Sequence, residues 1–190
     1  MNTFAAPVSE TLKTHDARAT FFVSGLWAER NSDALRSIAE SGRAEIGTLG
    51  NTHTRMSALS QRQQELDLTT AQSIIGGVTG KKVELFRAPH GEYSDALLSV
   101  AERLGFHTIQ WGIDPLGAQE ASAYEITQRV LQSVTPGSIV RLAADNAGVA
   151  EALGAVIEGL KNKGYSFRTV GELILRENFT IDQTGKQTRR

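Results

Sequence analysis

His53 is the first residue in this chain whose surroundings suggest chemistry. It lies on a polar loop that follows a short apolar stretch at residues 44–47 and precedes a helical pattern. Delivery of a side chain from the C-terminal end of a strand is how α/β barrels position metal ligands and catalytic groups. A lone loop histidine is more often solvated or bonded to its own loop, so any chemistry depends on partners elsewhere in the chain.

Two later segments supply candidate partners for His53. Residues 87–91 carry Arg87, Pro89 and His90, and residues 111–114 run from a tryptophan to Asp114. The arginine and the carboxylate could contact a substrate, and they could equally form an ion pair at the mouth of a barrel. Both tryptophans, at 27 and 111, have apolar neighbours, which favours core positions over platforms for a sugar ring.

The elements that position these residues alternate between strand and helix. Short apolar runs typical of parallel strands covered on both faces lie at residues 17–23, 44–47, 83–87, 106–113, 138–142 and 165–168. Helices are predicted at residues 4–15, 26–41, 93–104, 124–134, 149–163 and 170–175, with a further long helix between the Ser60 cap and Gly80. This alternation predicts an α/β fold with a parallel sheet or barrel. Right-handed crossovers would then bring the loops that follow the strands to one face.

The composition fits one globular domain. With 190 residues, 40% of them hydrophobic, the chain is long enough to bury a single core. A formal net charge of -1 gives no electrostatic case for binding nucleic acid or an anionic membrane. No apolar run approaches the roughly 20 residues needed to span a bilayer, and no signal peptide is visible. We expect one domain over residues 1–176 and a frayed polar tail over residues 177–190.

Five segments resemble the polysaccharide deacetylase family in their order and spacing. They are residues 19–25, the segments around His53, Arg87 and Asp114, and residues 136–140. This family is also called the NodB-homology domain or carbohydrate esterase family 4, and the resemblance covers about residues 4–173. It implies an irregular (β/α) barrel that removes acetyl groups from N-acetylated sugars of chitin or peptidoglycan, or from O-acetylated xylan. In the family, a divalent metal, usually zinc, is held by one Asp and two His and activates water. A second Asp and a late His serve as general base and general acid.

The resemblance assigns roles to five retained residues besides His53. Arg87 matches the arginine that steadies the general base, and Asp114 matches an acidic position, so both would have supporting catalytic roles. Pro89 and His90 match the wall of the substrate groove. Leu142 matches the leucine that lines the acetyl pocket.

Other positions depart from the family pattern. The first of the two metal histidines is replaced by Leu49, whose aliphatic side chain offers zinc no lone pair, so His53 would be a vestigial metal ligand. The position of the general acid holds Ala143, and the tryptophan expected within residues 115–119 is not found there. These departures predict a degenerate member of the family.

The opening strand of the family, which carries the Asp pair, would precede the helix that begins near Phe4, and this sequence does not contain it. We therefore expect a NodB-type barrel that lacks its first strand. The neighbouring strand edges, at residues 18–23 and near Phe167, are expected to be exposed and to permit self-association.

The leading hypothesis is a polysaccharide deacetylase-like protein of peptidoglycan or chitin metabolism whose catalysis, the hydrolysis of an amide C–N bond, is lost or impaired. No cofactor is expected for such a pseudoenzyme, whereas an active protein would need zinc or another divalent metal. One alternative is an active metal-dependent N-deacetylase with unusual ligands, for instance His53, His90 and an upstream Asp. Others are a non-catalytic envelope or spore protein that binds glycan or a partner protein, and an unrelated α/β barrel. The resemblance implies a location in the cell envelope or outside the cytoplasm.

Overall fold

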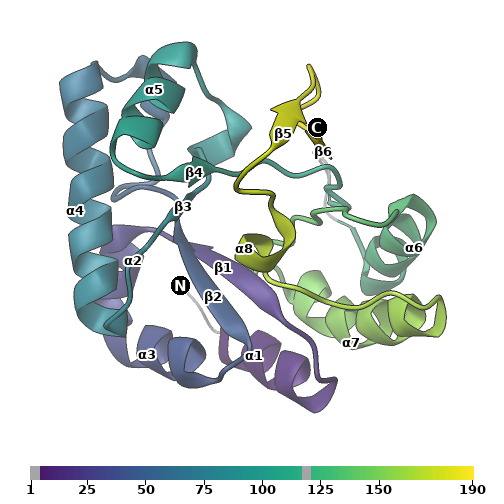
Figure 1. Cartoon of the computed structure of the whole chain (residues 1–190). Helices are drawn as coiled ribbons and strands as arrows, with labels where there is room; N and C mark the ends of the chain where they lie inside the picture. Colours follow the sequence, from purple (N-terminus) through teal and green to yellow (C-terminus); the bar gives the residue numbers. More distant parts are fainter. Residues whose placement is uncertain (1–4, 117–120) are drawn as a thin grey trace.

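The computed structural model of the chain describes residues 5–116 and 121–190. Its centre is a parallel sheet in the order β1-β2-β3-β4 (Figure 1). The four strands are β1 (Ala19–Val23), β2 (Ala44–Thr48), β3 (Leu85–Phe86) and β4 (His107–Thr108). A single parallel bridge, Ile113 to Val140, continues the arrangement beyond β4. The predicted α/β fold with a parallel sheet is therefore confirmed, although the described strands form an open sheet and not a continuously bonded barrel.

Helices surround this sheet, and most lie where the apolar periodicity predicts them. They are α1 (Ala5–Thr14), α2 (Gly25–Arg30), α3 (Ser32–Glu40), α4 (Gln61–Thr79), α5 (Asp95–Arg103), α6 (Ala123–Ser133), α7 (Ala147–Asn162) and α8 (Val170–Leu173). Short 3-10 turns, η1 (Met56–Ala58) and η2 (Pro89–Gly91), lie in the loops after β2 and β3. Figure 1 shows α2 to α5 on one side of the sheet and α6 and α7 on the other. Phe4, the predicted start of the first helix, and residues 117–119 of the segment 115–119 lie outside the described residues.

Four predicted elements differ from the structure. The strand expected at residues 106–113 is reduced to β4 and the isolated bridge at Ile113. The helix expected at residues 26–41 is divided into α2 and α3 at Asn31, whose backbone leaves the helical region (φ -129°, ψ 38°) and whose side chain donates to the Trp27 carbonyl. The strand expected at residues 138–142 contributes only the bridge at Val140. The strand expected at residues 165–168 does not form, because Tyr165 donates its backbone N–H to Leu160 and its hydroxyl to Val134, which ties the segment to α6 and α7.

The prediction of a frayed end after residue 176 is also wrong. Strands β5 (Phe179–Ile181) and β6 (Gln187–Arg189) form an antiparallel hairpin. The side chain of Gln187 accepts from the N–H of Leu175 at 2.7 Å and donates to its carbonyl at 3.0 Å, so a polar side chain holds the hairpin against the domain. The domain boundary at residue 176 remains a prediction.

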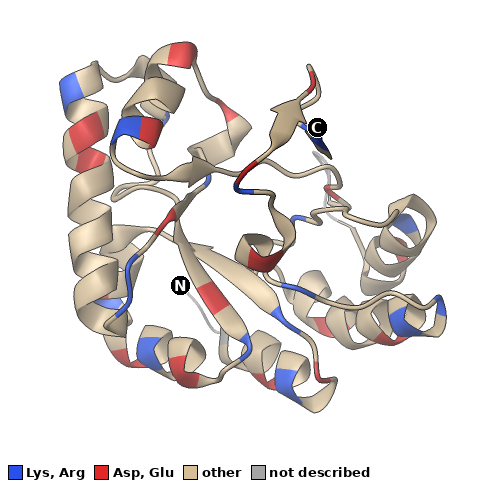
Figure 2. Cartoon of the chain, in the orientation of Figure 1, with Lys and Arg blue, Asp and Glu red and all other residues tan. Residues whose placement is uncertain are grey.

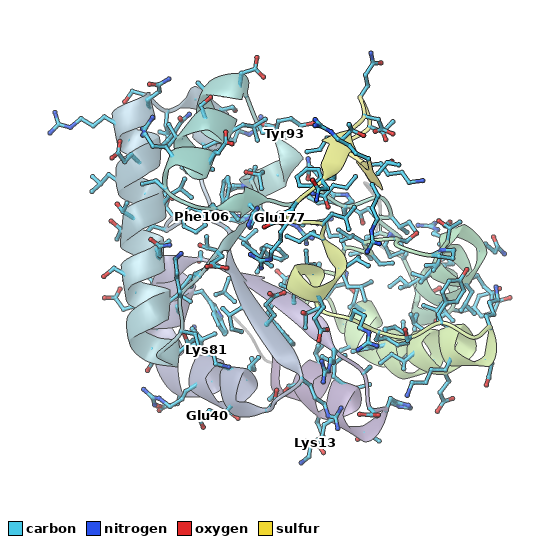
Figure 3. All side chains as sticks on the ribbon, in the orientation of Figure 1. Lys13, Glu40, Lys81, Tyr93, Phe106 and Glu177 are labelled. Atoms are coloured by element: carbon cyan, nitrogen blue, oxygen red, sulfur yellow. The ribbon has the colours of Figure 1, made fainter. Side chains whose placement is uncertain are left out.

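Two large apolar regions flank the sheet. The first lies among α2, α3, α4, α5 and β3, and its fully buried side chains include Leu35, Leu68, Ile75, Phe86 and Leu97. The second joins α6 and α7 around Ile126 and Val156, and a smaller cluster joins α1 to α7 around Leu12 and Ile157. In Figure 3, Phe106 lies within the fold near α5, whereas Lys13 and Glu40 lie at its periphery.

The amino-terminal end of the sheet is closed by a segment from far along the chain. The backbone N–H of Val170 donates to Thr20 Oγ1, and the N–H of Gly171 donates to Glu45 Oε2, both at 2.8 Å. Thr20 Oγ1 also donates to Glu45 Oε2 at 2.8 Å. These bonds join β1 and β2 to the first turn of α8, at the end of the sheet opposite to the predicted site.

Strand β1 pairs with β2 and stands at the edge of the sheet. Self-association through this edge therefore remains a prediction. In the ribbon of Figure 2, the positions of Lys and Arg and those of Asp and Glu are interspersed over the helices, in keeping with the net charge of -1. Within the described ranges, no helix is long and apolar enough to cross a membrane.

Candidate functional site

The C-terminal ends of the strands bring most of the predicted site residues together. The Arg87 N–H donates to the Thr48 carbonyl at 2.9 Å, which aligns the segment after β3 with the end of β2. The Arg141 N–H donates to the Ile113 carbonyl at 2.8 Å, which aligns the segment after Val140 with the residues before Asp114. Parallel pairing thus delivers several loops to one end of the sheet, as the sequence predicts.

Hydrogen bonds to helix α4 hold the loop that carries His53. Both oxygens of Asp67 accept bonds from the loop, from the Asn51 N–H at 2.6 Å and from Thr52 Oγ1 at 3.0 Å. Gly50 and His53 have left-handed backbone conformations, with φ of 79° and 59°. Sequence reasoning missed Asp67, and its only signal is an acidic residue beside Leu68 on the helix face that is buried.

His53 and His90 lie against each other. Their ring centroids are 4.9 Å apart with an interplanar angle of 54°. His90 lies in η2 with φ of 60°, and the next residue, Gly91, is packed so closely on Trp111 that an added Cβ would lie 2.8 Å from the Trp111 ring. Gln110 Nε2 donates to the Gly91 carbonyl at 3.0 Å. The turn is therefore held on the indole, and the imidazole of His90 is held beside His53.

Arg87 and Arg141 share the same indole. The Arg87 guanidinium carbon lies 4.1 Å from the Phe22 ring centroid and 5.5 Å from that of Trp111. The Arg141 guanidinium carbon lies 5.1 Å from the Trp111 centroid. Cations over aromatic faces are attracted by the ring quadrupole. Trp111, expected in a core, is thus half-buried beneath two cations, whereas Trp27 packs against the first apolar region as predicted.

Asp114 forms an ion pair with Arg141, with Nη1 and Oδ2 at 2.5 Å. The ion pair between Arg87 and Asp114 that the sequence suggested is not formed. Among the described residues, no carboxylate lies within ion-pair distance of Arg87. Sequence reasoning missed Arg141. Its signal is a charged residue within the apolar run of residues 139–142, where alternate side chains of a strand face opposite sides.

Ring contacts, an ion pair and the electrostatic effect of Arg141 on His53 relate six residues, which we call the strand-end cluster: His53, Arg87, His90, Trp111, Asp114 and Arg141. Pro89 is buried beside it in η2. Leu142 packs against the apolar clusters of α1, α6 and α7, so the structure does not bring it into the strand-end cluster. Its assignment to an acetyl pocket remains a prediction.

Positive charge dominates the electrostatics of the strand-end cluster. Burial, and then the charge of Arg141, lower the pKa of Arg87 to about 10. Burial also lowers the pKa of His53, followed by the charges of His90 and Arg141, with an opposing contribution from Asp145. Each cationic form is thus disfavoured by desolvation and by like charge nearby.

Substitution of His90 by asparagine is expected to raise the pKa of His53. Asparagine tolerates the positive φ at this position, removes the neighbouring charge and exposes the His53 ring. In the native protein, His53 should titrate below its ordinary value of 6.5, so the free energy of unfolding should decrease as the pH falls through 6.5. NMR titration of the imidazole protons measures the pKa, and urea denaturation at several pH values measures the free energy of unfolding, with His107→Asn as control because His107 lies on β4. An unchanged His53 titration in His90→Asn would contradict the interpretation.

The residues of the strand-end cluster do not fit a structural or catalytic zinc site. Such sites use at least three protein ligands, and no group of three or more His, Cys, Asp or Glu side chains able to hold a metal occurs among the described residues. Two imidazoles are present, but the carboxylate of Asp114 is bound by Arg141. The guanidinium groups would also repel a divalent cation.

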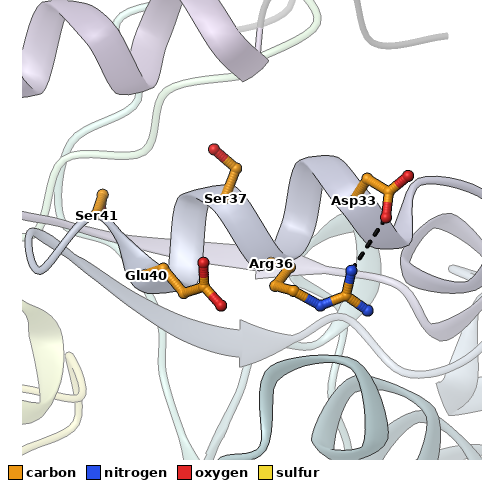
Figure 4. A pocket seen from close by; sticks show the side chains of 5 residues that line it. All are labelled: Asp33, Arg36, Ser37, Glu40 and Ser41. Atoms are coloured by element: carbon orange, nitrogen blue, oxygen red, sulfur yellow. Dashed lines mark hydrogen bonds and ion pairs between the residues drawn. The ribbon is translucent and has the colours of Figure 1, made fainter.

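A shallow hollow of about 380 Å³ lies elsewhere, on the outer surface of α3 (Figure 4). It is lined by Asp33, Arg36, Ser37, Glu40 and Ser41. Arg36 and Asp33 are paired at 3.0 Å, one turn apart. This hollow is the exposed polar face of a single helix, and it contains none of the predicted site residues.

Comparison with known proteins gives a consistent family assignment. A family profile described as Polysaccharide deacetylase matches residues 1–109. The uncharacterized protein YlxY of Bacillus subtilis is 30% identical over 175 residues, which is 91% of this chain and 54% of YlxY. The peptidoglycan-N-acetylmuramic acid deacetylase PdaA of Bacillus subtilis is 26% identical over 185 residues, 95% of this chain and 70% of PdaA. The chain thus spans about half the length of YlxY.

Solved structures agree with this assignment. BA3943 of Bacillus anthracis, described as a pseudoenzyme of carbohydrate esterase family 4, superposes with a TM-score of 0.85 at 30% identity, covering 90% of this chain and 60% of BA3943. A mutant of BA3943 is described as having restored enzymatic activity. The family 4 carbohydrate esterase of Streptomyces lividans, in complex with acetate, gives a TM-score of 0.84 at 25% identity, covering 100% of this chain and 92% of the esterase.

Proposed function

The chain belongs to the polysaccharide deacetylase family, and we propose that it is a member that binds glycan at the strand-end cluster without removing acetyl groups. The glycan would be of the peptidoglycan type, as the names of the related deacetylases suggest, or of the chitin type, as the family resemblance implies. A role at cell-envelope glycan follows from the same relatives.

The observation that carries this proposal is the identity of the residues at two functional positions. Leu49 and Ala143 stand where the family resemblance places a metal histidine and the general acid. Neither side chain can bind a cation or transfer a proton. These positions lie in separate segments, one after β2 and one after Val140, so a single local change does not account for both.

Retained residues keep the means to contact a saccharide. Arg87 and Arg141 present nitrogen donors beside one indole ring, and Pro89 lies in the turn that carries His90 next to His53. Polar donors that converge beside an aromatic surface are typical of ligand sites. Arg87 and Asp114 would then position the ligand and would not act on its acetyl group.

Acetate release is expected to be absent when the protein is incubated with acetylated chitooligosaccharide or peptidoglycan in the presence of zinc or cobalt. The Streptomyces lividans esterase would serve as the active comparator. Binding of the same saccharides, followed by NMR shifts of the Trp111 indole N–H, is expected to persist in metal-free buffer. Metal-dependent acetate release that His53→Ala abolishes would instead establish an active deacetylase with unusual ligands.

A further inference from the structure

We propose that Tyr93, Arg55 and Glu92 form a second sugar subsite beside the strand-end cluster, so that each added sugar unit tightens binding of a glycan. This inference rests on the proposed glycan-binding function and names the residues that would hold a neighbouring sugar. It follows from the exposure of one aromatic ring, from the fixed turn that carries it and from the ion pair next to it.

Tyr93 is an exposed aromatic residue at the edge of the strand-end cluster. Four large apolar side chains are strongly exposed in the described part of the chain, and the exposed fraction of Tyr93 is 53%. The other three lie on α4, α6 and β5: Leu66, Tyr124 and Ile181. Tyr93 instead follows β3 and η2, two residues after Gly91, which packs on Trp111. Two residues span at most about 7 Å, so the ring is carried directly beside the cluster.

The backbone on both sides of Tyr93 is fixed. Before it, the Glu92 N–H donates to the Pro89 carbonyl at 3.2 Å and closes the η2 turn. After it, Ser94 caps α5, and its hydroxyl accepts from the Leu97 N–H at 3.3 Å. A ligand that contacts an aromatic ring on a fixed backbone loses little affinity to ordering of the protein.

Arg55 and Glu92 supply polar groups next to this ring. Arg55 Nη1 lies 3.0 Å from Glu92 Oε1, so the ion pair joins the loop after β2 to the loop after β3. His53 and His90 join the same two loops. The side chains of Arg55 and Glu92 are 69% and 39% exposed, which leaves their polar edges open to a ligand. A carboxylate and a guanidinium held together offer an acceptor and donors at fixed spacing, which suits neighbouring hydroxyls of a sugar.

This combination favours a saccharide over an apolar protein segment. A pyranose ring has C–H groups on its faces and hydroxyls around its edge, so it can stack on an aromatic face and bond to polar groups beside it. Docking of an apolar protein segment would be expected to use a contiguous apolar patch. Tyr93 is bordered by Glu92 and Ser94 in the sequence, and Arg55 is paired with Glu92. The ring is thus placed to stack on the sugar next to the one at the strand-end cluster.

The test compares saccharides that differ only in length. N-acetylglucosamine and its β-1,4-linked disaccharide and trisaccharide are titrated into the protein, and NMR shifts of the Trp111 indole N–H and of the Tyr93 ring give the dissociation constants. Affinity is expected to increase about tenfold from the monosaccharide to the trisaccharide. Tyr93→Ala should remove most of this increase and leave the affinity for the monosaccharide unchanged. Tyr93→Phe should retain it, because the aromatic face remains.

Further variants locate the effect. Arg55→Gln and Glu92→Gln should each weaken binding of the trisaccharide about threefold, because each removes one side of the fixed polar pair. Tyr124→Ala is the matched control, because Tyr124 is 73% exposed on α6, on the other side of the sheet from α5. It should leave all three dissociation constants unchanged. Circular dichroism verifies folding of each variant.

Equal affinity for the monosaccharide and the trisaccharide would overturn the subsite and leave glycan binding at the strand-end cluster intact. An undiminished increase with length in Tyr93→Ala would also overturn it. Binding of the trisaccharide that requires Tyr93 but is unchanged in Arg141→Gln would support the subsite and contradict binding at the strand-end cluster. Absence of binding of all three saccharides would contradict both proposals.

Discussion

Replacement of Gly50 by alanine is expected to destabilise the protein by about 2–4 kcal/mol. Gly50 has φ of 79°, a conformation that L side chains rarely adopt. An added Cβ would lie 2.4 Å from Asp67 Oδ1 and 3.2 Å from Met56 Sδ, so Asp67 would have to move. That movement would break the bonds from Asn51 and Thr52 that hold the His53 loop. Urea denaturation measures the loss, and NMR of the His53 ring should show exchange broadening.

Gly80→Ala is the matched control for this prediction. Gly80 also has a left-handed backbone, with φ of 67°, but nothing lies within 4 Å of an added Cβ. It ends α4, the helix that carries Asp67. Its replacement should cost about 1 kcal/mol from the backbone conformation alone. Equal losses at the two glycines would show that the contact with Asp67 contributes nothing.

Replacement of Phe86 by alanine is expected to cost about 3–5 kcal/mol, because a fully buried aromatic side chain would leave a cavity. Phe86 has no exposed surface and lies on the short strand β3, in tilted contact with Phe106 at 6.3 Å. It precedes Arg87, so relaxation around the cavity should also displace the guanidinium from Phe22. Thermal and urea unfolding measure the first effect, and NMR shifts of the Trp111 indole N–H measure the second.

Tyr124→Ala provides the comparison for an aromatic residue outside the core. Tyr124 is 73% exposed on α6, and its loss should change the free energy of unfolding by less than about 0.5 kcal/mol. A loss of under about 1 kcal/mol in Phe86→Ala would mean that the first apolar region contributes little to stability.

Helix boundaries were predictable where local chemistry determines them. Ser60 and Gln63 form a reciprocal capping box at the start of α4, and Gly80 ends it in the left-handed conformation. The burial of individual side chains was less predictable. Leu66 fits the apolar side of α4 by periodicity but is 66% exposed, whereas Gln64 is buried and donates to the carbonyls of Met56 and Leu59. Those partners follow from tertiary contacts and not from the pattern of the helix.

Only part of the strand-end cluster was predictable, because some of its residues are placed by the strand topology and others by tertiary contacts. His53, Arg87 and His90 follow strands, so parallel topology alone places them at one end of the sheet. Arg141 and Asp67 act through contacts with residues 27 and 16 positions away, at Asp114 and at Asn51. The pairing of Ile113 with Val140 creates the first contact, and the packing of α4 beneath the loop creates the second. Neither arrangement is encoded in local spacing.

The bonds from Val170 and Gly171 to Thr20 and Glu45 have a consequence for biosynthesis. As the polypeptide leaves the ribosome, β1 and β2 emerge early, but the groups that satisfy the Thr20 hydroxyl and the Glu45 carboxylate are translated more than a hundred residues later. Nascent chains must therefore pass through a stage in which these two strands are held only by local contacts. Chaperone capture and aggregation during translation are expected to concentrate in that interval.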